Sequence, residues 1–178
     1  MVNYQDKFNE LVRNQFVYGG QKYALSAERE STDVLFDTFG KNWLLGTMCK
    51  YCFRFKNLAR ERDILKIACY VYILWLKRGF FIKEGGFEYD VVDTNVKLKD
   101  EYFNIFVEKV NQVPIMELTS PDWLSRIQNK LVELAKEPWG IIKEKELFYL
   151  YINCVRLWQE RGYFYQKSHD EDVNNGKK

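Results

Sequence analysis

One predicted helix, over residues 42–56, carries a face that could hold phosphate groups and stack a nucleobase. At positions i, i+4, i+7 and i+11 this face combines an aromatic ring, a hydroxyl and two cations: Trp43, Thr47, Lys50 and Arg54. A second, apolar face is expected in the core and consists of Leu44, Met48, Tyr51 and Phe55. With Arg60 and Lys66 from the next helix, the first face forms a candidate polyanion-binding strip. The alternative interpretation is a solvated helix face paired with nearby acids.

Four carboxylates offer an enzymatic alternative, a magnesium-dependent nucleotide pyrophosphohydrolase. They stand in two pairs along the chain: Glu30 with Asp33, and Glu61 with Asp63. A hard cation that bridges phosphates needs several carboxylates, which is why such pairs matter. The second pair, however, has a spacing that points its side chains about 160° apart on a helix. Glu61 and Asp63 can equally be first-turn acids that complement the helix dipole.

The cysteines do not indicate a metal site. Cys49 and Cys52 have the spacing of half a zinc site, but a structural zinc needs four ligands. Cys69 and Cys154 stand alone, and the single histidine, His169, lies in the C-terminal tail. We therefore expect no Ser-His-Asp or Cys-His nucleophile and no cofactor, apart from Mg²⁺ under the pyrophosphohydrolase alternative.

Two stretches of the sequence end alike and indicate a tandem duplication. At an offset of 158 − 75 = 83, Trp75 aligns with Trp158, and Arg-Gly and an aromatic residue follow each. Residues 5–12 also resemble residues 100–107, at an offset of 100 − 5 = 95. We expect each glycine to adopt a left-handed conformation after the last helical turn, with the aromatic ring folding back onto that turn.

Each copy is predicted to contain three helices, and these helices must position the residues described above. The predicted ranges are 4–15, 42–56 and 60–77 in the first copy, and 100–112, 121–136 and 143–160 in the second. The third helices are apolar almost all round and should pack against each other in the centre. The fold is thus predicted to be all-α, with two degenerate tandem three-helix repeats packed through their third helices.

The remaining segments follow from this division. Residues 1–82 form the first repeat, with an insert at 18–40 that contains a short helix over 26–39. Residues 83–99 are expected to be a linker, residues 100–166 the second repeat, and residues 167–178 a polar, disordered tail.

Composition limits the classes of function. The 178 residues are 47% hydrophobic and carry a net charge of +2, so polyanion binding requires a local concentration of positive charge. No apolar run reaches the about 20 residues of a membrane span, and no signal-peptide core is present. Four cysteines inside apolar helical stretches favour a reducing, cytoplasmic location.

The polyanion-binding strip also carries a family resemblance. The residues that fit a pattern Leu-Gly-x-x-x-Lys-Tyr-x-x-Arg, a short loop and Asp-Leu-x-Lys-Ala-x-x-Tyr are Leu45, Gly46, Lys50, Tyr51, Arg54, Asp63, Leu65, Lys66, Ala68 and Tyr70. This pattern resembles the core of a family of small phage-encoded helical proteins of unknown function, sometimes described as nucleotide kinases. Residues 18–24 and 42–43 are similar to phage dATP/dGTP diphosphohydrolases, relatives of the helical pyrophosphohydrolases. The Arg-His and acid-Gly-His segments of the diphosphohydrolases have no counterpart here.

These observations favour one function over two others. The resemblance implies a viral or mobile-element origin and a link to nucleotides. We expect a non-catalytic accessory protein that binds a nucleotide or nucleic acid through Trp43, Lys50, Arg54, Arg60 and Lys66. The alternatives are the pyrophosphohydrolase and a helical protein-interaction module, such as an inhibitor of a host protein.

Overall fold

The computed structural model describes residues 3–22, 31–89, 92, 96–114 and 122–165. This part of the chain is all-helical, with no strand, which confirms the predicted all-α class. Its α-helices are α1 (Tyr4–Lys22), α2 (Ser31–Phe39), α3 (Lys41–Leu58), α4 (Glu61–Lys77), α5 (Val96–Asn111), α6 (Trp123–Lys136) and α7 (Glu144–Glu160). Two short 3-10 helices complete it, η1 (Trp139–Ile141) and η2 (Tyr163–Tyr165).

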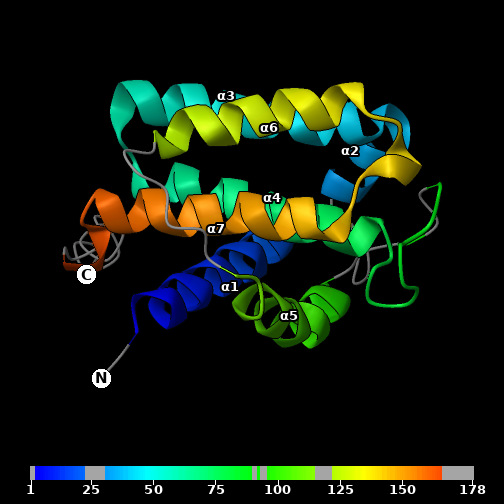
Figure 1. Ribbon diagram of the computed structural model, residues 1–178, viewed down its shortest axis with the longest axis horizontal. Helices are drawn as coiled ribbons and strands as arrows, with labels where there is room; N and C mark the ends of the chain where they lie inside the picture. The colour runs from blue at the N-terminus through cyan, green and yellow to red at the C-terminus, as the bar shows by residue number, and fades with distance from the viewer. Residues whose placement is uncertain (1–2, 23–30, 90–91, 93–95, 115–121, 166–178) are drawn as a thin grey trace.

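The longer helices pack in three layers of two (Figure 1). Helices α3 and α6 form one outer layer, α4 and α7 the middle layer, and α1 and α5 the other outer layer. The short α2 lies against one end of α3. None of the described helices is both long and apolar enough to cross a membrane.

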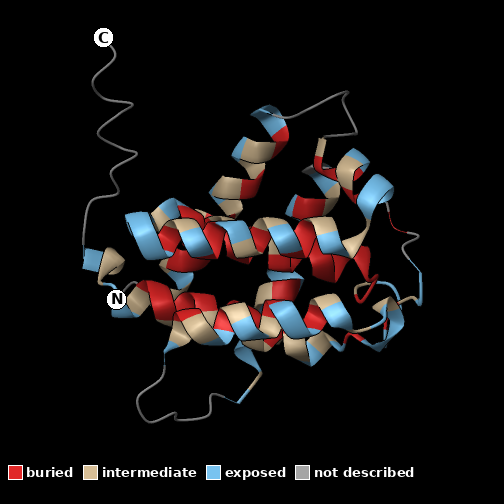
Figure 2. Ribbon diagram, turned by 90° about the horizontal axis from the view of Figure 1, so that it is seen from above, coloured by how far each residue is buried: buried red, intermediate tan, exposed pale blue. Residues whose placement is uncertain are grey.

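The middle layer forms the core because its helices are apolar on nearly every side. Trp75 of α4 and Trp158 of α7 are both 0% exposed. In Figure 2 the buried residues lie on the sides of the helices that face one another, while exposed residues line the outer faces. Burying two such large aromatic side chains in the centre contributes strongly to stability.

The two middle helices run antiparallel and exchange hydrogen bonds at both ends. Trp75 Nε1 donates to Glu144 Oε1 at 2.9 Å, and Trp158 Nε1 donates to Glu61 Oε1 at 2.7 Å. Each tryptophan stands in the later part of its helix and each glutamate in the first turn of the other helix. Glu61 and Glu144 are therefore placed where a buried indole N–H needs an acceptor.

Both middle helices end as the sequence predicted. Gly79 and Gly162 follow the last turns with φ of 75° and 76°, in the left-handed region that favours glycine. The ring centroid of Phe81 lies 6.0 Å from that of Trp75, and the matching distance from Phe164 to Trp158 is 6.1 Å. The aromatic residue after each glycine thus folds back onto its own helix.

Arg78, the residue before Gly79, is 1% exposed and joins two connecting segments. Its guanidinium donates to the carbonyls of Gly85 at 3.0 Å and Ile142 at 2.9 Å, and also to the carbonyl of Phe87. The start of the segment predicted as a linker is therefore fixed to the connection that leads into α7. The end of that segment is helical, because α5 begins at Val96 rather than at residue 100.

Other boundaries differ from the prediction for local reasons. Helix α1 continues to Lys22, beyond the predicted end at residue 15. Helix α6 begins at Trp123, where the Asp122 side chain accepts from the Ser125 amide at 3.1 Å and so caps the helix. Three predicted parts lie outside the described residues: the start of α6 at residue 121, residues 26–30 of the insert helix, and the tail at 167–178.

The insert helix α2 is attached to α4 through charge. Asp33 and Lys77 are 1% and 0% exposed, and their charged groups lie 3.5 Å apart. Lys77 also donates to the Val92 carbonyl at 3.3 Å and lies over the Phe36 ring. A buried pair of this kind is costly to break, because removal of one partner leaves the other charge uncompensated. It therefore fixes where α2 lies against the bundle.

Candidate functional site

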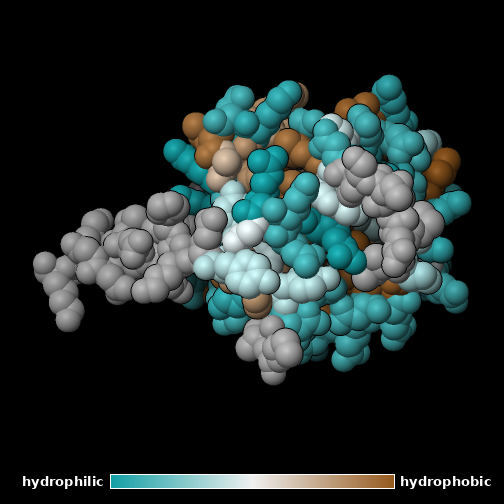
Figure 3. Space-filling model, turned by 60° about the vertical axis from the view of Figure 1, so that its left-hand side comes forward, coloured by the Kyte–Doolittle hydropathy of each residue, from teal (hydrophilic) through white to brown (hydrophobic). Residues whose placement is uncertain are grey.

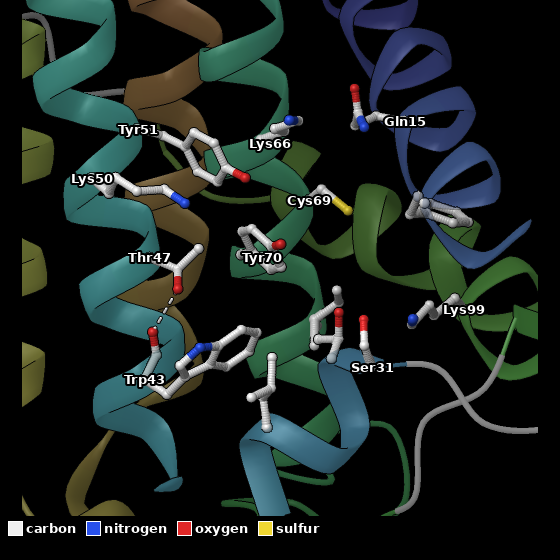
Figure 4. Close-up of a pocket in the computed structure, with 15 residues that line it drawn as sticks. Gln15, Ser31, Trp43, Thr47, Lys50, Tyr51, Lys66, Cys69, Tyr70 and Lys99 are labelled. Carbon is white, nitrogen blue, oxygen red and sulfur yellow. Dashed lines mark hydrogen bonds between the residues drawn. The ribbon is translucent and has the colours of Figure 1, made fainter. Parts of the chain in front are cut away.

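A pocket of about 330 Å³ opens between α1, α2, α3 and α4, and Lys99 of α5 reaches it as well (Figure 4). This volume lies within the lower range of small-molecule sites. Its charged and aromatic lining residues are Phe16, Trp43, Lys50, Tyr51, Lys66, Tyr70 and Lys99. Polar lining comes from Gln15, Ser31, Thr32 and Thr47.

Helical spacing explains why α3 lines the pocket. Trp43, Thr47, Lys50 and Tyr51 occupy neighbouring turns on one side of the helix, and Figure 4 shows their side chains pointing into the same space. The Thr47 hydroxyl donates to the Trp43 carbonyl at 2.8 Å, so this hydroxyl is held against the helix. The apolar side of α3 is buried, as predicted, with Met48 at 0% exposure.

The aromatic rings form a row along the pocket. Trp43 meets Tyr70 edge to face, with centroids 6.4 Å apart and planes at 80°. Tyr70 and Tyr51 are stacked, with centroids 6.1 Å apart and planes at 15°. Such rings offer both faces and edges to a planar ligand.

Two lysines meet at the Tyr51 ring. Lys50 Nζ and Lys66 Nζ each lie 4.9 Å from its centroid, within the range of a cation–π interaction. Burial lowers the pKa of Lys66, and the positive charges of Arg62 and Arg54 lower it further. Among the described residues neither Lys50 nor Lys66 forms an ion pair. The ammonium groups at this end of the pocket would be stabilised by an anion.

Lys99 lies at the far wall of the pocket and is 1% exposed. Its side chain points toward the pocket in Figure 4. Burial lowers the pKa of its amine to about 8, because the charged form is poorly solvated there. The Lys99 carbonyl accepts from the buried Tyr72 hydroxyl at 2.6 Å, which fixes this turn of α5 against α4.

The structure brings three of the five predicted polyanion-binding residues together. Trp43, Lys50 and Lys66 line the pocket. Arg54 lies close by, with its guanidinium 5.7 Å from the Tyr51 centroid and 3.5 Å from the buried carboxylate of Asp63. Arg60 does not line the pocket: it is exposed and precedes α4 as its N-terminal capping residue. The face predicted on α3 is therefore one wall of the site.

The prediction omitted the lining residues that come from α1, α2 and α5. Lys99 was assigned to the linker, although it belongs to α5. Ser31 and Thr32 begin α2, and Gln15 lies on α1. Spacing within one helix identifies residues that share a face, but which helices meet is decided by the tertiary packing. The single-helix pattern thus contained no information on these residues.

The described acids of the pyrophosphohydrolase alternative do not converge. Asp33 pairs with Lys77 at the end of α4, whereas Asp63 stands in its first turn, so about 21 Å of helix separates the two regions. Glu61 accepts from Trp158, and Asp63 pairs with Arg54. Glu30 lies outside the described residues. The part of the chain that the structure describes contains no group of three or more metal-binding side chains.

Of the two neighbouring cysteines on α3, Cys52 lies in the core and Cys49 is half-buried. Cys52 is 0% exposed, and burial raises the pKa of its thiol to about 12; burial also raises the pKa of the Cys49 thiol. All four cysteines are free thiols. Thiols of raised pKa are poor metal ligands, because the ligand is the thiolate.

Comparisons of the chain with protein-family models, with curated proteins and with solved structures found no match.

Proposed function

We propose that this protein binds a nucleotide, without catalysis, in the pocket between α1, α2, α3 and α4. The observation that carries the proposal is the convergence of Lys50, Lys66 and Lys99 on one volume lined by Trp43 and Tyr70. In this proposal the phosphate lies between the lysines, and the base lies against the aromatic row. Positive charge beside stacked rings is the chemistry that recognises nucleotides.

Pocket size favours a single nucleotide over a nucleic-acid strand. A volume of about 330 Å³ suits a small ligand, and α2 closes one side of the space. Proteins that bind a strand instead offer a groove that follows the backbone over several nucleotides. The predicted strip, from Trp43 to Lys66, would be such an open surface, whereas α1 and α2 wall in the pocket that Trp43, Lys50 and Lys66 line.

The second half of the chain provides a contrast that supports the role of Lys50. The second helices of the two copies align where Trp43-Leu44 matches Trp123-Leu124, at an offset of 123 − 43 = 80, and Lys130 then corresponds to Lys50. Its amine lies 2.6 Å from Glu133 and 3.6 Å from Glu146, so its charge is compensated within the protein. Lys50 instead lies over an aromatic ring at the pocket. Lys130 is thus the natural control for Lys50.

The proposal is tested by calorimetric titration of the protein with nucleoside 5′-phosphates, the matching nucleosides, inorganic phosphate and a single-stranded oligonucleotide. We expect the 5′-phosphates to bind and the nucleosides to bind at least about tenfold more weakly, since a charged hydrogen bond contributes about 1.5–3 kcal/mol. Lys50→Gln and Lys66→Gln should each weaken nucleotide binding by a similar factor.

Lys130→Gln is the matched control and should leave nucleotide affinity unchanged. Thermal melting of each variant checks that the fold is retained. Equal affinities in Lys66→Gln and Lys130→Gln would exclude the pocket as the site. Binding of the oligonucleotide without binding of any mononucleotide would mean that the ligand is a strand.

We further propose that the chain is a degenerate tandem repeat of three helices packed through α4 and α7, of viral or mobile-element origin. The two Trp–Glu hydrogen bonds support the repeat, because Glu61 and Glu144 share the offset of the tryptophans, 144 − 61 = 83. The first helices correspond less simply. Phe8 packs edge-on against Trp158 at 5.5 Å, but its counterpart against Trp75, at 5.3 Å, is Phe106 and not the sequence-aligned Phe103.

A further inference from the structure

Positive charge continues beyond the pocket, toward the turn that joins α3 to α4. The two helices pack side by side and only two residues connect them, so they run antiparallel (Figure 1). On α3, Arg54 lies one helical turn beyond Lys50, about 6 Å along the axis. On α4, Arg62 lies one turn beyond Lys66 in the same direction. Both rows of cations therefore begin at the pocket and run toward the same turn.

Three of these four cations lie around the ring of Tyr51. The guanidinium carbon of Arg54 is 5.7 Å from the ring centroid, and the Nζ atoms of Lys50 and Lys66 are each 4.9 Å from it. Arg62 is exposed and acts on the same group. Burial is the largest cause that lowers the pKa of Lys66, and the positive charge of Arg62 is the next. The four charges thus form one cluster at the mouth of the pocket.

The acid that pairs with this cluster holds it loosely. The carboxylate of Asp63 is 0% exposed and lies 3.5 Å from Arg54 Nη2. Neither of its oxygens accepts a hydrogen bond from a described residue. The guanidinium of Arg54 therefore keeps N–H donors for another acceptor. The other acid of this turn, Glu61, accepts from Trp158 of α7.

The cluster carries more charge than one phosphate can neutralise. A phosphate monoester has about −1.5 to −2 charges near pH 7. The four cations carry four positive charges, of which Asp63 compensates one. Arginine also presents paired N–H donors that match the oxygens of a phosphate group. A chain of phosphates would meet both conditions.

We propose that the ligand is a nucleoside polyphosphate, a di- or triphosphate, whose outer phosphates lie between Arg54 and Arg62. The inner phosphate lies at Lys50 and Lys66, so this inference rests on the proposed function for the nucleoside and adds the phosphate chain. Neither arginine lines the pocket, and the outer phosphates therefore lie outside it, in contact with solvent. Figure 3 brings forward the end of the molecule where α3 leads into α4, and hydrophilic side chains cover most of the described surface there.

The test is calorimetric titration of the full chain, without divalent cations, with the 5′-mono-, di- and triphosphate of one nucleoside. Inorganic phosphate and tripolyphosphate are titrated alongside. We expect the triphosphate to bind at least about tenfold more tightly than the monophosphate, because charge-assisted hydrogen bonds to arginine are strong. Arg62→Gln should abolish most of this difference, and Arg62→Lys should keep part of it because the charge remains.

Arg156→Gln is the matched control, since it removes an arginine of α7 that donates to Gln159 and does not line the pocket. The control should keep the full difference between triphosphate and monophosphate, and thermal melting of each variant checks the fold. An equal loss in Arg156→Gln and Arg62→Gln would assign the difference to net charge and overturn the proposal.

The remaining outcomes separate this inference from the proposed function. Equal affinities for the mono- and triphosphate would overturn the phosphate chain and leave nucleotide binding in place. Binding of tripolyphosphate but of no nucleotide, with a loss in Arg62→Gln, would support the cation cluster and remove the proposed function. If neither nucleotides nor tripolyphosphate bind, both proposals are overturned.

Discussion

Replacing Lys99 with methionine is expected to flatten the pH dependence of nucleotide binding between about pH 7 and pH 9. The amine is 1% exposed at the pocket wall, and burial lowers its pKa from 10.5 to about 8. A bound phosphate favours the protonated amine, so binding should be strongest below this pKa and weaken as the pH rises through it. Methionine keeps the length and apolar character of the side chain but carries no proton.

The size of the effect follows from the pKa of about 8. At that value roughly nine tenths of the amines are protonated at pH 7 and roughly one tenth at pH 9. If only the protonated form binds phosphate, the apparent dissociation constant rises about tenfold across this range. Cys69, which also lines the pocket, stays neutral in the window because burial raises the pKa of its thiol to about 12.

Calorimetric titrations at about pH 7, 8 and 9, at constant ionic strength, measure the slope in both proteins. The ligand phosphate and Lys66 contribute equally to both, so the difference in slope isolates Lys99. Thermal melting of the variant verifies the fold. Parallel slopes for the wild type and Lys99→Met, or a wild-type affinity that does not change with pH, would refute the assignment of Lys99 to the phosphate.

Two further predictions concern the middle helices. Trp75→Ala and Trp158→Ala should each lower the free energy of unfolding by about 3–5 kcal/mol in urea denaturation, because both side chains are fully buried; an unchanged midpoint for both would contradict their central packing. Gly162→Ala should lower the free energy of unfolding by about 1 kcal/mol, because an alanine is strained in the left-handed backbone conformation of this position. Gly79→Ala should lower the free energy of unfolding by about 1–3 kcal/mol more than Gly162→Ala. A Cβ at Gly79 would lie 2.3 Å from the Phe87 ring, whereas a Cβ at Gly162 would have no neighbour within 4 Å. Equal losses in the two variants would show that the Phe87 ring moves aside freely.

Helix ends and buried faces were the most predictable part of this fold. The buried side of α3 and the left-handed glycines after α4 and α7 follow from local spacing and backbone preference, and both are observed. The pairing of Asp33 with Lys77 could not be predicted, because the partners stand far apart in the sequence and meet only through packing. The segment at 83–99 looked like a linker because its glycines and acids are typical of loops, and the contacts of Arg78 are invisible in the sequence.

Of the candidate site, the part on α3 could be predicted from helical spacing, whereas the part that other helices contribute depends on tertiary packing. Trp43 and Lys50 share a face at helical spacing, so their common orientation needs no tertiary information. Arg60 was grouped with them by charge, but it precedes the first turn of α4 and is exposed away from the pocket lining. Lys99 was missed because a lysine is ordinarily expected at the surface, and its burial depends on how α5 packs.

The reciprocal bonds between Trp75 and Glu144 and between Trp158 and Glu61 affect how the chain acquires its structure during synthesis. While the first half emerges from a ribosome, Trp75 has no acceptor and Arg78 lacks the carbonyl of Ile142. Until α7 has been made, these buried donors lack their native acceptors, and each unsatisfied group of this kind costs about 1–3 kcal/mol. The second half of the chain therefore contributes directly to the stability of the end of the first.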